Sequence, residues 1–83
     1  MTLVYILLRA EHGKIGLVKA ALSKYEEIKD LHEVFGRYDL IFKVETKNSG
    51  EFKRFVRNRL RIMEGIKNIE PLFTADDDMP ENI

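Results

Sequence analysis

The stretch Leu31-His32-Glu33-Val34-Phe35-Gly36-Arg37-Tyr38-Asp39-Leu40-Ile41-Phe42-Lys43-Val44 places two largely apolar runs on either side of a single glycine. The run from Leu31 to Phe35 predicts one strand, and Asp39–Thr46 predicts the next, because apolar side chains recur through both. Gly36-Arg37-Tyr38 is too short for anything but a tight connection, and glycine adopts backbone angles that other residues avoid. The stretch therefore predicts an antiparallel hairpin.

A strand and a helix are predicted before this hairpin. Thr2–Arg9 contains six consecutive apolar residues and predicts a strand that ends at Glu11-His12-Gly13. Residues 14–26 then show an apolar side chain every three or four positions, which is typical of an amphipathic helix. The side chains that mark this helix are Ile15, Val18, Leu22 and Tyr25.

A second helix and a last strand are predicted after the hairpin. Asn48 or Ser49 begins the helix as its N-cap, and Gly65 follows its last periodic residue, where a C-cap is expected. Ile66–Phe73 predicts the fourth strand, and Pro71 places it at a sheet edge because proline donates no ladder hydrogen bond. The apolar face of the helix consists of Phe52, Phe55, Val56, Leu60 and Met63.

The order strand, helix, strand, strand, helix, strand (βαββαβ) predicts an α+β protein with a ferredoxin-like split βαβ fold. In this fold a four-stranded antiparallel sheet carries two helices on one face, with the first and third strands at its centre. The first strand is apolar on both faces, with Leu3, Tyr5 and Leu7 on one face and Val4, Ile6 and Leu8 on the other, although the helices cover only one face of the sheet. We therefore expect a homodimer that pairs sheet to sheet.

Composition restricts the chain to one small domain. It has 83 residues and no cysteine, which excludes thiol chemistry and disulfides and fits a cytoplasmic protein. The 14 basic and 14 acidic side chains cancel, but four of the acids, Asp76, Asp77, Asp78 and Glu81, lie near the C-terminus. Residues 1–75 are predicted to form the domain, with ten acids against 14 bases, and residues 76–83 a flexible acidic tail. No apolar run is long enough for a membrane span or a signal peptide.

No motif points to catalysis, to a metal ion or to a cofactor. The two histidines, His12 and His32, lie 20 residues apart with no ligand spacing between them, and no serine sits in a nucleophile motif. No glycine-rich phosphate loop is present. We predict that the protein is not an enzyme, although a small ferredoxin-like dimeric enzyme using Tyr38, Asp39 and His32 remains an alternative.

The second helix carries a basic stripe of Lys53, Arg57 and Arg61, spaced four residues apart. Such a stripe can neutralise phosphates, so a nucleic-acid-binding module is a second alternative. A solvated helix face with bases near the negative end of the helix dipole explains the same residues.

The hairpin turn is the strongest candidate for a ligand site. Gly36 permits close approach of the backbone, Tyr38 offers a ring and a hydroxyl, and Asp39 places a carboxylate where a strand begins. Asp39 is expected to accept hydrogen bonds from the turn amides. Amides and a carboxylate at a hairpin tip can also hold the charged ends of a small zwitterion.

These residues, the Gly36-x-Tyr38-Asp39-Leu40 turn above all, resemble the RAM (regulation of amino-acid metabolism) domain. Val34-Phe35, Ile41-Phe42-Lys43-Val44 and Glu64-Gly65-Ile66 extend the resemblance across residues 2–74. RAM domains are the effector-binding domains of the Lrp/AsnC transcription regulators.

The resemblance implies a non-enzymatic module that binds an amino-acid effector and assembles into homodimers and further into tetramers or octamers. It implies ligand-binding roles for Gly36, Arg37, Tyr38, Asp39 and Thr74. The first strand begins at the start of the chain, where family members have a helix-turn-helix module. We therefore expect a stand-alone domain that does not bind DNA directly and that can co-assemble with full-length Lrp/AsnC regulators.

Overall fold

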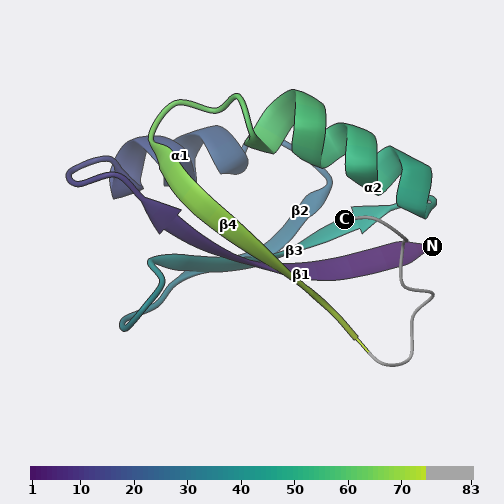
Figure 1. The fold of residues 1–83 in the computed structure, drawn as a ribbon, viewed down its shortest axis with the longest axis horizontal. Coiled ribbons are helices and arrows are strands. Elements are labelled where there is room, and N and C mark those ends of the chain that lie inside the picture. Colours follow the sequence, from purple (N-terminus) through teal and green to yellow (C-terminus); the bar gives the residue numbers. More distant parts are fainter. Residues whose placement is uncertain (75–83) are drawn as a thin grey trace.

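The computed structural model describes residues 1–74, which form four strands and three short helical segments (Figure 1). The predicted acidic tail, residues 76–83, lies outside the described residues. In chain order the elements are β1 (Thr2–Ala10), α1 (Ile15–Leu22), β2 (Ile28–Glu33), β3 (Leu40–Thr46), α2 (Ser49–Phe55), the π-helical turn η1 (Val56–Leu60) and β4 (Ile66–Phe73).

The strands form one antiparallel sheet in the order β2-β3-β1-β4, and both helices lie over the same face of it (Figure 1). The predicted βαββαβ fold is confirmed, with β1 and β3 at the centre. β4 is an edge strand, as Pro71 requires, and Pro71 lies opposite Ile6 in the register with β1.

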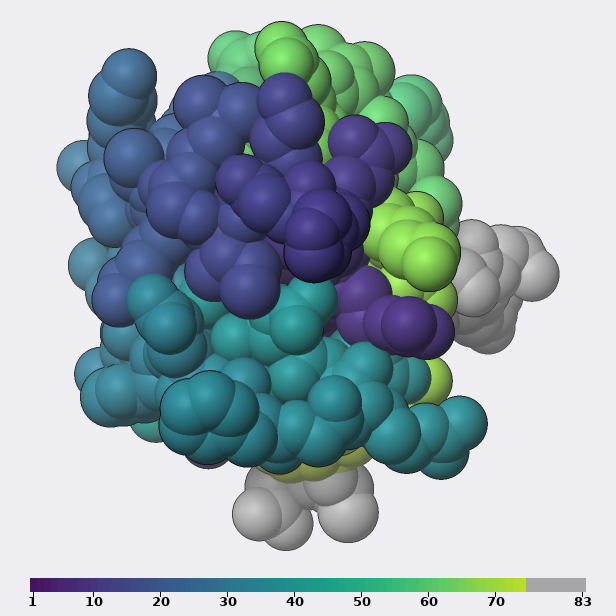
Figure 2. All heavy atoms as spheres, turned by 90° about the vertical axis from the view of Figure 1, so that its left-hand side faces the viewer, coloured from purple at the N-terminus to yellow at the C-terminus, as the bar shows by residue number. Residues whose placement is uncertain are grey.

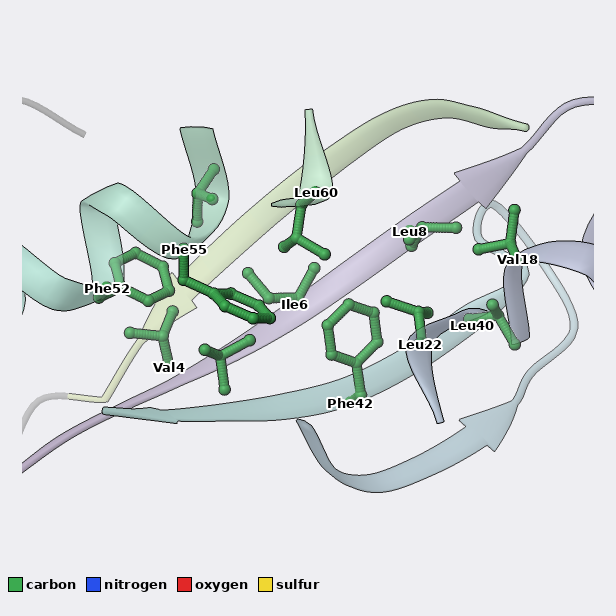
Figure 3. Close-up of a cluster of buried hydrophobic side chains, with 12 residues drawn as sticks. Val4, Ile6, Leu8, Val18, Leu22, Leu40, Phe42, Phe52, Phe55 and Leu60 are labelled. Atoms are coloured by element: carbon green, nitrogen blue, oxygen red, sulfur yellow. The ribbon is translucent and has the colours of Figure 1, made fainter. Parts of the chain in front are cut away.

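The core fills the space between the sheet and the helices (Figure 3). Alternate residues of β1 and β3 point into it, which is the period-two pattern of a sheet with one face packed. Fully buried side chains come from both central strands and all helical segments: Val4, Ile6, Leu8, Val18, Leu22, Leu40, Phe42, Val44, Phe52 and Leu60.

The other face of the sheet, which we call the open face, carries the remaining apolar residues of the central strands. Leu3, Tyr5, Leu7 and Ile41 are half-buried there, and Leu72 of β4 is exposed beside Tyr5. No described segment covers this face, because both helices lie on the opposite side (Figure 1). Sheet-to-sheet dimerisation stays a prediction.

The first helix and the second strand have other ends than predicted. A turn after the helix and a bulge in the strand place apolar side chains in the core at the same spacing as a regular element would. The first helix ends at Leu22 and not at residue 26, yet Tyr25 still packs edge-on against Phe55, with 5.5 Å between ring centroids. The second strand runs over Ile28–Glu33 and not Leu31–Phe35, since a register shift after Lys29 turns Leu31 toward the core.

The second helix also departs from the expected continuous α-helix. It becomes a π-helical turn after Phe55, where the Arg61 N–H donates to the Val56 carbonyl across five residues. Gly65 does not cap it, because the helical segment has already ended at Leu60. Gly65 instead approaches α1 so closely that a Cβ atom would lie 3.0 Å from a Val18 methyl group.

Candidate ligand-binding cleft

Asp39 closes the turn between β2 and β3 with one hydrogen bond and fixes it to the end of β1 with two more. Its N–H donates to the Leu8 carbonyl (2.9 Å), and its carbonyl accepts from the Val34 N–H (3.0 Å). Its carboxylate Oδ2 accepts from the Ala10 N–H at 2.9 Å. The expectation that Asp39 caps the amides of its own turn is therefore wrong: the carboxylate reaches the neighbouring strand, because β1 extends past the start of β3.

Glycine makes this turn possible. Gly36 has a φ of 125°, a region that residues with a Cβ atom rarely adopt, and nothing lies within 4 Å of the place its Cβ would occupy. The constraint is therefore the backbone conformation and not crowding.

The loop between β1 and α1 lies beside this turn. Its chain reverses at Gly13 (φ 77°), and the Lys14 N–H donates to the Glu11 carbonyl at 2.9 Å. The Glu11 N–H donates to the Gly65 carbonyl at 2.7 Å, which ties the loop to the start of β4. Three segments distant in the sequence therefore meet at one end of the sheet.

Between these segments lies a hollow of about 460 Å³, which we call the turn cleft. Figure 2 looks onto this end of the molecule, where the purple β1–α1 loop, the teal β2–β3 turn and the light green start of β4 come together. The cleft is lined by Arg9, Ala10, Glu11, His12, Gly13, Ile15, Gly36, Arg37, Asp39 and Lys67.

Both signs of charge face the turn cleft. Arg9, Arg37 and Lys67 are exposed, and none of them forms an ion pair within residues 1–74. Glu11 is likewise exposed and unpaired, whereas Asp39 uses one carboxylate oxygen for Ala10. The cleft therefore offers groups for an anionic and for a cationic part of one small ligand.

Three of the five predicted ligand-binding residues, Gly36, Arg37 and Asp39, line the turn cleft. The Tyr38 side chain does not: its hydroxyl donates to Glu70 Oε1 of β4 at 2.7 Å. That hydrogen bond to a carboxylate raises the pKa of Tyr38 above its usual value of 10.0. Tyr38 thus fastens the turn to β4.

Thr74, the fifth predicted residue, lies at the other end of the sheet. It follows Phe73, which pairs with Val4, whereas the turn cleft lies beyond Leu8 on the same strand. The turn cleft does not include it.

Sequence reasoning missed four ionisable side chains of the turn cleft: Arg9, Glu11, His12 and Lys67. The sequence places His12 only in the break after the first strand, which gives it no ligand role. Arg9 and Lys67 come together through the pairing of β1 with β4, where Arg9 lies opposite Asn68. A register between two strands 60 residues apart leaves no local signal in the sequence.

The groups named for the enzyme alternative are not joined. Asp39 binds Ala10, Tyr38 binds Glu70, and His32 is exposed on β2, with no hydrogen bond between any two of the three in the described part of the chain. Across residues 1–74, no three histidine, aspartate or glutamate side chains gather as a metal site would require. No helix among these residues has the length and apolarity to span a membrane.

The basic stripe of the second helix lies away from the turn cleft. Arg57 and Arg61 are exposed and Lys53 is half-buried, and none of them forms an ion pair among the described residues. A wider hollow of about 750 Å³ lies beside this helix, near the start of β1. It is lined by Met1, Glu26, Glu27, Glu45, Thr46, Lys47, Glu51, Arg54, Phe55, Asn58 and Arg59. The predicted ligand turn therefore borders the smaller of these two hollows.

The chain thus combines a ferredoxin-like sheet with a charged cleft beside a glycine turn. The model of the family described as "Lrp/AsnC ligand binding domain" matches residues 3–76, nearly the whole chain. The chain belongs to this family, and it is an effector-binding module of a kind found in transcription regulators.

Known relatives agree with this assignment. The chain is 43% identical over 54 residues to the HTH-type transcriptional regulator FL11 of Pyrococcus abyssi, a match over 65% of the chain and 36% of FL11. It spans well under half the length of the curated relatives it matches.

Solved structures share the fold. The crystal structure of FFRP-DM1 has a TM-score of 0.86 and 31% identity, with 89% of this chain and 99% of that chain covered. A Neisseria meningitidis transcriptional regulator solved as an L-Met complex has a TM-score of 0.81 at 16% identity, with 95% of this chain and 53% of that chain covered.

Proposed function

We propose that this chain binds a free amino acid in the turn cleft and acts as the effector-sensing module of a transcription regulator of amino-acid metabolism. The observation that carries the proposal is the presence, in one hollow beside the Gly36 turn, of cations and carboxylates that form no ion pair within residues 1–74. An amino acid is a zwitterion, so it needs a partner of each sign within a few ångströms. The L-Met complex of the Neisseria relative supports this ligand class.

The module binds its ligand without a reaction. Two of the three groups named for the enzyme alternative form structural hydrogen bonds, Asp39 with Ala10 and Tyr38 with Glu70. The relatives described as transcriptional regulators fit a binding role.

Self-assembly is part of the proposal. The apolar open face supports a homodimer that pairs sheet to sheet, because leaving such a face in water is unfavourable. Phe35 is fully exposed (101%) beside Gly36, where it can contact a further copy in a tetramer or octamer or in a mixed assembly with a full-length Lrp/AsnC regulator. A cytoplasmic location fits such a regulator.

Isothermal titration of the purified protein with each of the twenty amino acids tests the ligand. We expect at least one to bind at millimolar concentration or more tightly. Gly36→Ala should abolish this binding, because alanine is strained at a φ of 125° and the turn must change shape.

Gly16→Ala is the matched control. Gly16 lies in α1, has open space around its Cβ position and does not line the cleft, so binding should be unchanged. Failure of all twenty amino acids to bind would rule out the sensing function and leave the fold and the family unaffected.

A nucleic-acid-binding function is the second candidate, supported by the exposed, unpaired Arg57 and Arg61. A gel shift that weakens with salt and is lost in the Arg57→Ala/Arg61→Ala double variant would favour it. The same variant should leave amino-acid binding unchanged, since neither residue lines the turn cleft.

A further inference from the structure

The turn cleft has an excess of positive charge. Three permanent cations line it, on Arg9, Arg37 and Lys67, against two carboxylates, on Glu11 and Asp39. His12 also lines the cleft. With a neutral His12 side chain, the lining carries one net positive charge.

Two neighbouring acids lie outside the lining. The Glu70 carboxylate accepts the Tyr38 hydroxyl at 2.7 Å, keeps its negative charge and does not line the cleft. Glu64, next to Gly65, has its own counter-charge in Lys14 at 3.7 Å. Within the lining itself the cations therefore outnumber the carboxylates.

Amino acids with neutral, basic and acidic side chains match the charges of this lining to different degrees. The ammonium of any amino acid can take Glu11 or the free oxygen of Asp39, and its carboxylate can take one of the cations. A neutral side chain then leaves the lining's excess charge without a partner, and a basic side chain adds to it. A carboxylate side chain supplies the missing negative charge.

We infer that the effector of this module is an amino acid with a carboxylate side chain, of the aspartate or glutamate class. The inference rests on the proposed function and adds to it the chemistry of the ligand. Arg9, Arg37 and Lys67 become the specificity-determining residues, with two of them needed for the two carboxylates. An exposed charge pair at about 4 Å is worth about 1 kcal/mol in water, so we expect a preference of about fivefold for an acid over its amide.

Titration calorimetry at low salt with the pairs aspartate and asparagine, and glutamate and glutamine, tests the inference. Each pair has the same shape and differs in one charge. We expect at least one acid to bind about fivefold more tightly than its amide, and the difference should shrink as salt is added. Equal or tighter binding of both amides would overturn the inference while leaving the proposed amino-acid function standing. No binding by any amino acid would remove both.

Charge-removing variants locate the preference. Arg37→Gln and Lys67→Gln each replace an exposed side chain, and at least one should bring the acid-to-amide ratio close to one. Lys29→Gln, on exposed β2 and outside the cleft, is the matched control and should keep the wild-type ratio. A ratio that both cleft variants leave unchanged would overturn the assignment of these cations.

Discussion

Asp39 connects the turn of the candidate site to the central strand of the sheet. Its side chain and its backbone both bond to β1, through Ala10 and Leu8 respectively. The Ala10 N–H is partly buried, so losing its acceptor leaves a donor with poor access to water. One residue therefore serves both the fold and the shape of the turn cleft.

Asp39→Ala should lower the free energy of unfolding by about 1–3 kcal/mol, the usual cost of leaving a buried donor unsatisfied. Asp39→Asn keeps an acceptor oxygen in place and should retain most of the stability. Urea unfolding at neutral pH measures both. Equal loss in the two variants would mean that the carboxylate's charge, and not the Ala10 hydrogen bond, holds the turn.

Asp30 combines an unusual backbone with an ion pair. It lies in the register shift of β2 at a φ of 51°, and its carboxylate is 2.9 Å from the Lys43 ammonium. The hydrogen bond from Lys43 lowers the pKa of Asp30 below 3.8, and the same bond raises the pKa of Lys43 above 10.5. The pair should thus stabilise the fold across the range between these two pKa values.

Asp30→Asn tests this pH dependence without changing the backbone preference, because asparagine tolerates the left-handed region. The folded-state pKa of Asp30 is lowered, so its contribution is present above 3.8 and is lost as the pH falls through the folded value. The variant should therefore have a lower urea midpoint than the wild type at neutral pH and an equal one in strong acid. Glu26→Gln, an exposed acid without an ion pair, should show no such difference at either pH.

For single residues, the sequence predicts the important positions of the turn better than it predicts their hydrogen-bond partners. Gly36 and Asp39 were identified from their types and positions alone. The Asp39–Ala10 hydrogen bond was not predictable, because it depends on β1 reaching two residues past its last pair with β3. The sequence predicts a ligand role for Tyr38 and gives no sign of its hydrogen bond to Glu70, because that bond joins residues 32 positions apart.

Among the elements, α2 shows how a short helix is held at its start. Asn48 Oδ1 accepts from the Glu51 N–H at 2.8 Å, and the Glu51 carboxylate lies 3.4 Å from the Lys47 N–H. This arrangement resembles a capping box, except that Glu51 accepts from the residue before the N-cap and not from the N-cap itself. It positions Phe52, which is fully buried and packs against Phe73 of β4.

Asn48→Ala should cost about 1 kcal/mol in the free energy of unfolding, because it leaves the Glu51 N–H without its acceptor. Thermal and urea unfolding measure the change. Asn58→Ala is the matched control: Asn58 is exposed in η1, and its side chain has no hydrogen bond in the described part of the chain, so stability should barely change. A similar loss in both variants would show that the cap contributes nothing specific.

Element types were predictable, and so were both ends of β4, whereas the ends of α1, β2 and the second helix were not. All four strands and both helices follow from apolar periodicity, which burial against one core imposes. The π-helical turn of η1 and the bulge of β2 shift that periodicity by one residue, and both keep apolar side chains in the core. The spacing of apolar residues indicates only which side chains are buried, so it cannot distinguish a π-helical turn or a bulge from a regular helix or strand.

For the whole molecule, the predicted topology is confirmed, and the candidate site follows from the topology more than from the motif. The turn cleft forms where β1, the β2–β3 turn and β4 end together, so three of its charges come from residues 9, 37 and 67. The topology also produces the open face: both helices lie on the other side of the sheet, so the apolar residues of β1 and β3 on this side have no cover among residues 1–74.

Leu7→Glu should separate the proposed sheet-to-sheet dimer into monomers. Leu7 lies on the open face between Ile41 of β3 and Glu70 of β4. In a dimer the introduced carboxylate would be buried without a cationic partner, whereas in a monomer it stays half-exposed to water. Light scattering should therefore give twice the 9.7 kDa chain mass, or a multiple of that, for the wild type and a single chain mass for the variant.

Leu17→Glu is the matched control, because it places the same charge on an exposed residue of α1, on the helix side of the sheet, and should leave the mass unchanged. If Leu7→Glu assembles like the wild type while remaining folded, the copies meet through another surface, and the exposed Phe35 beside the turn cleft becomes the next residue to change.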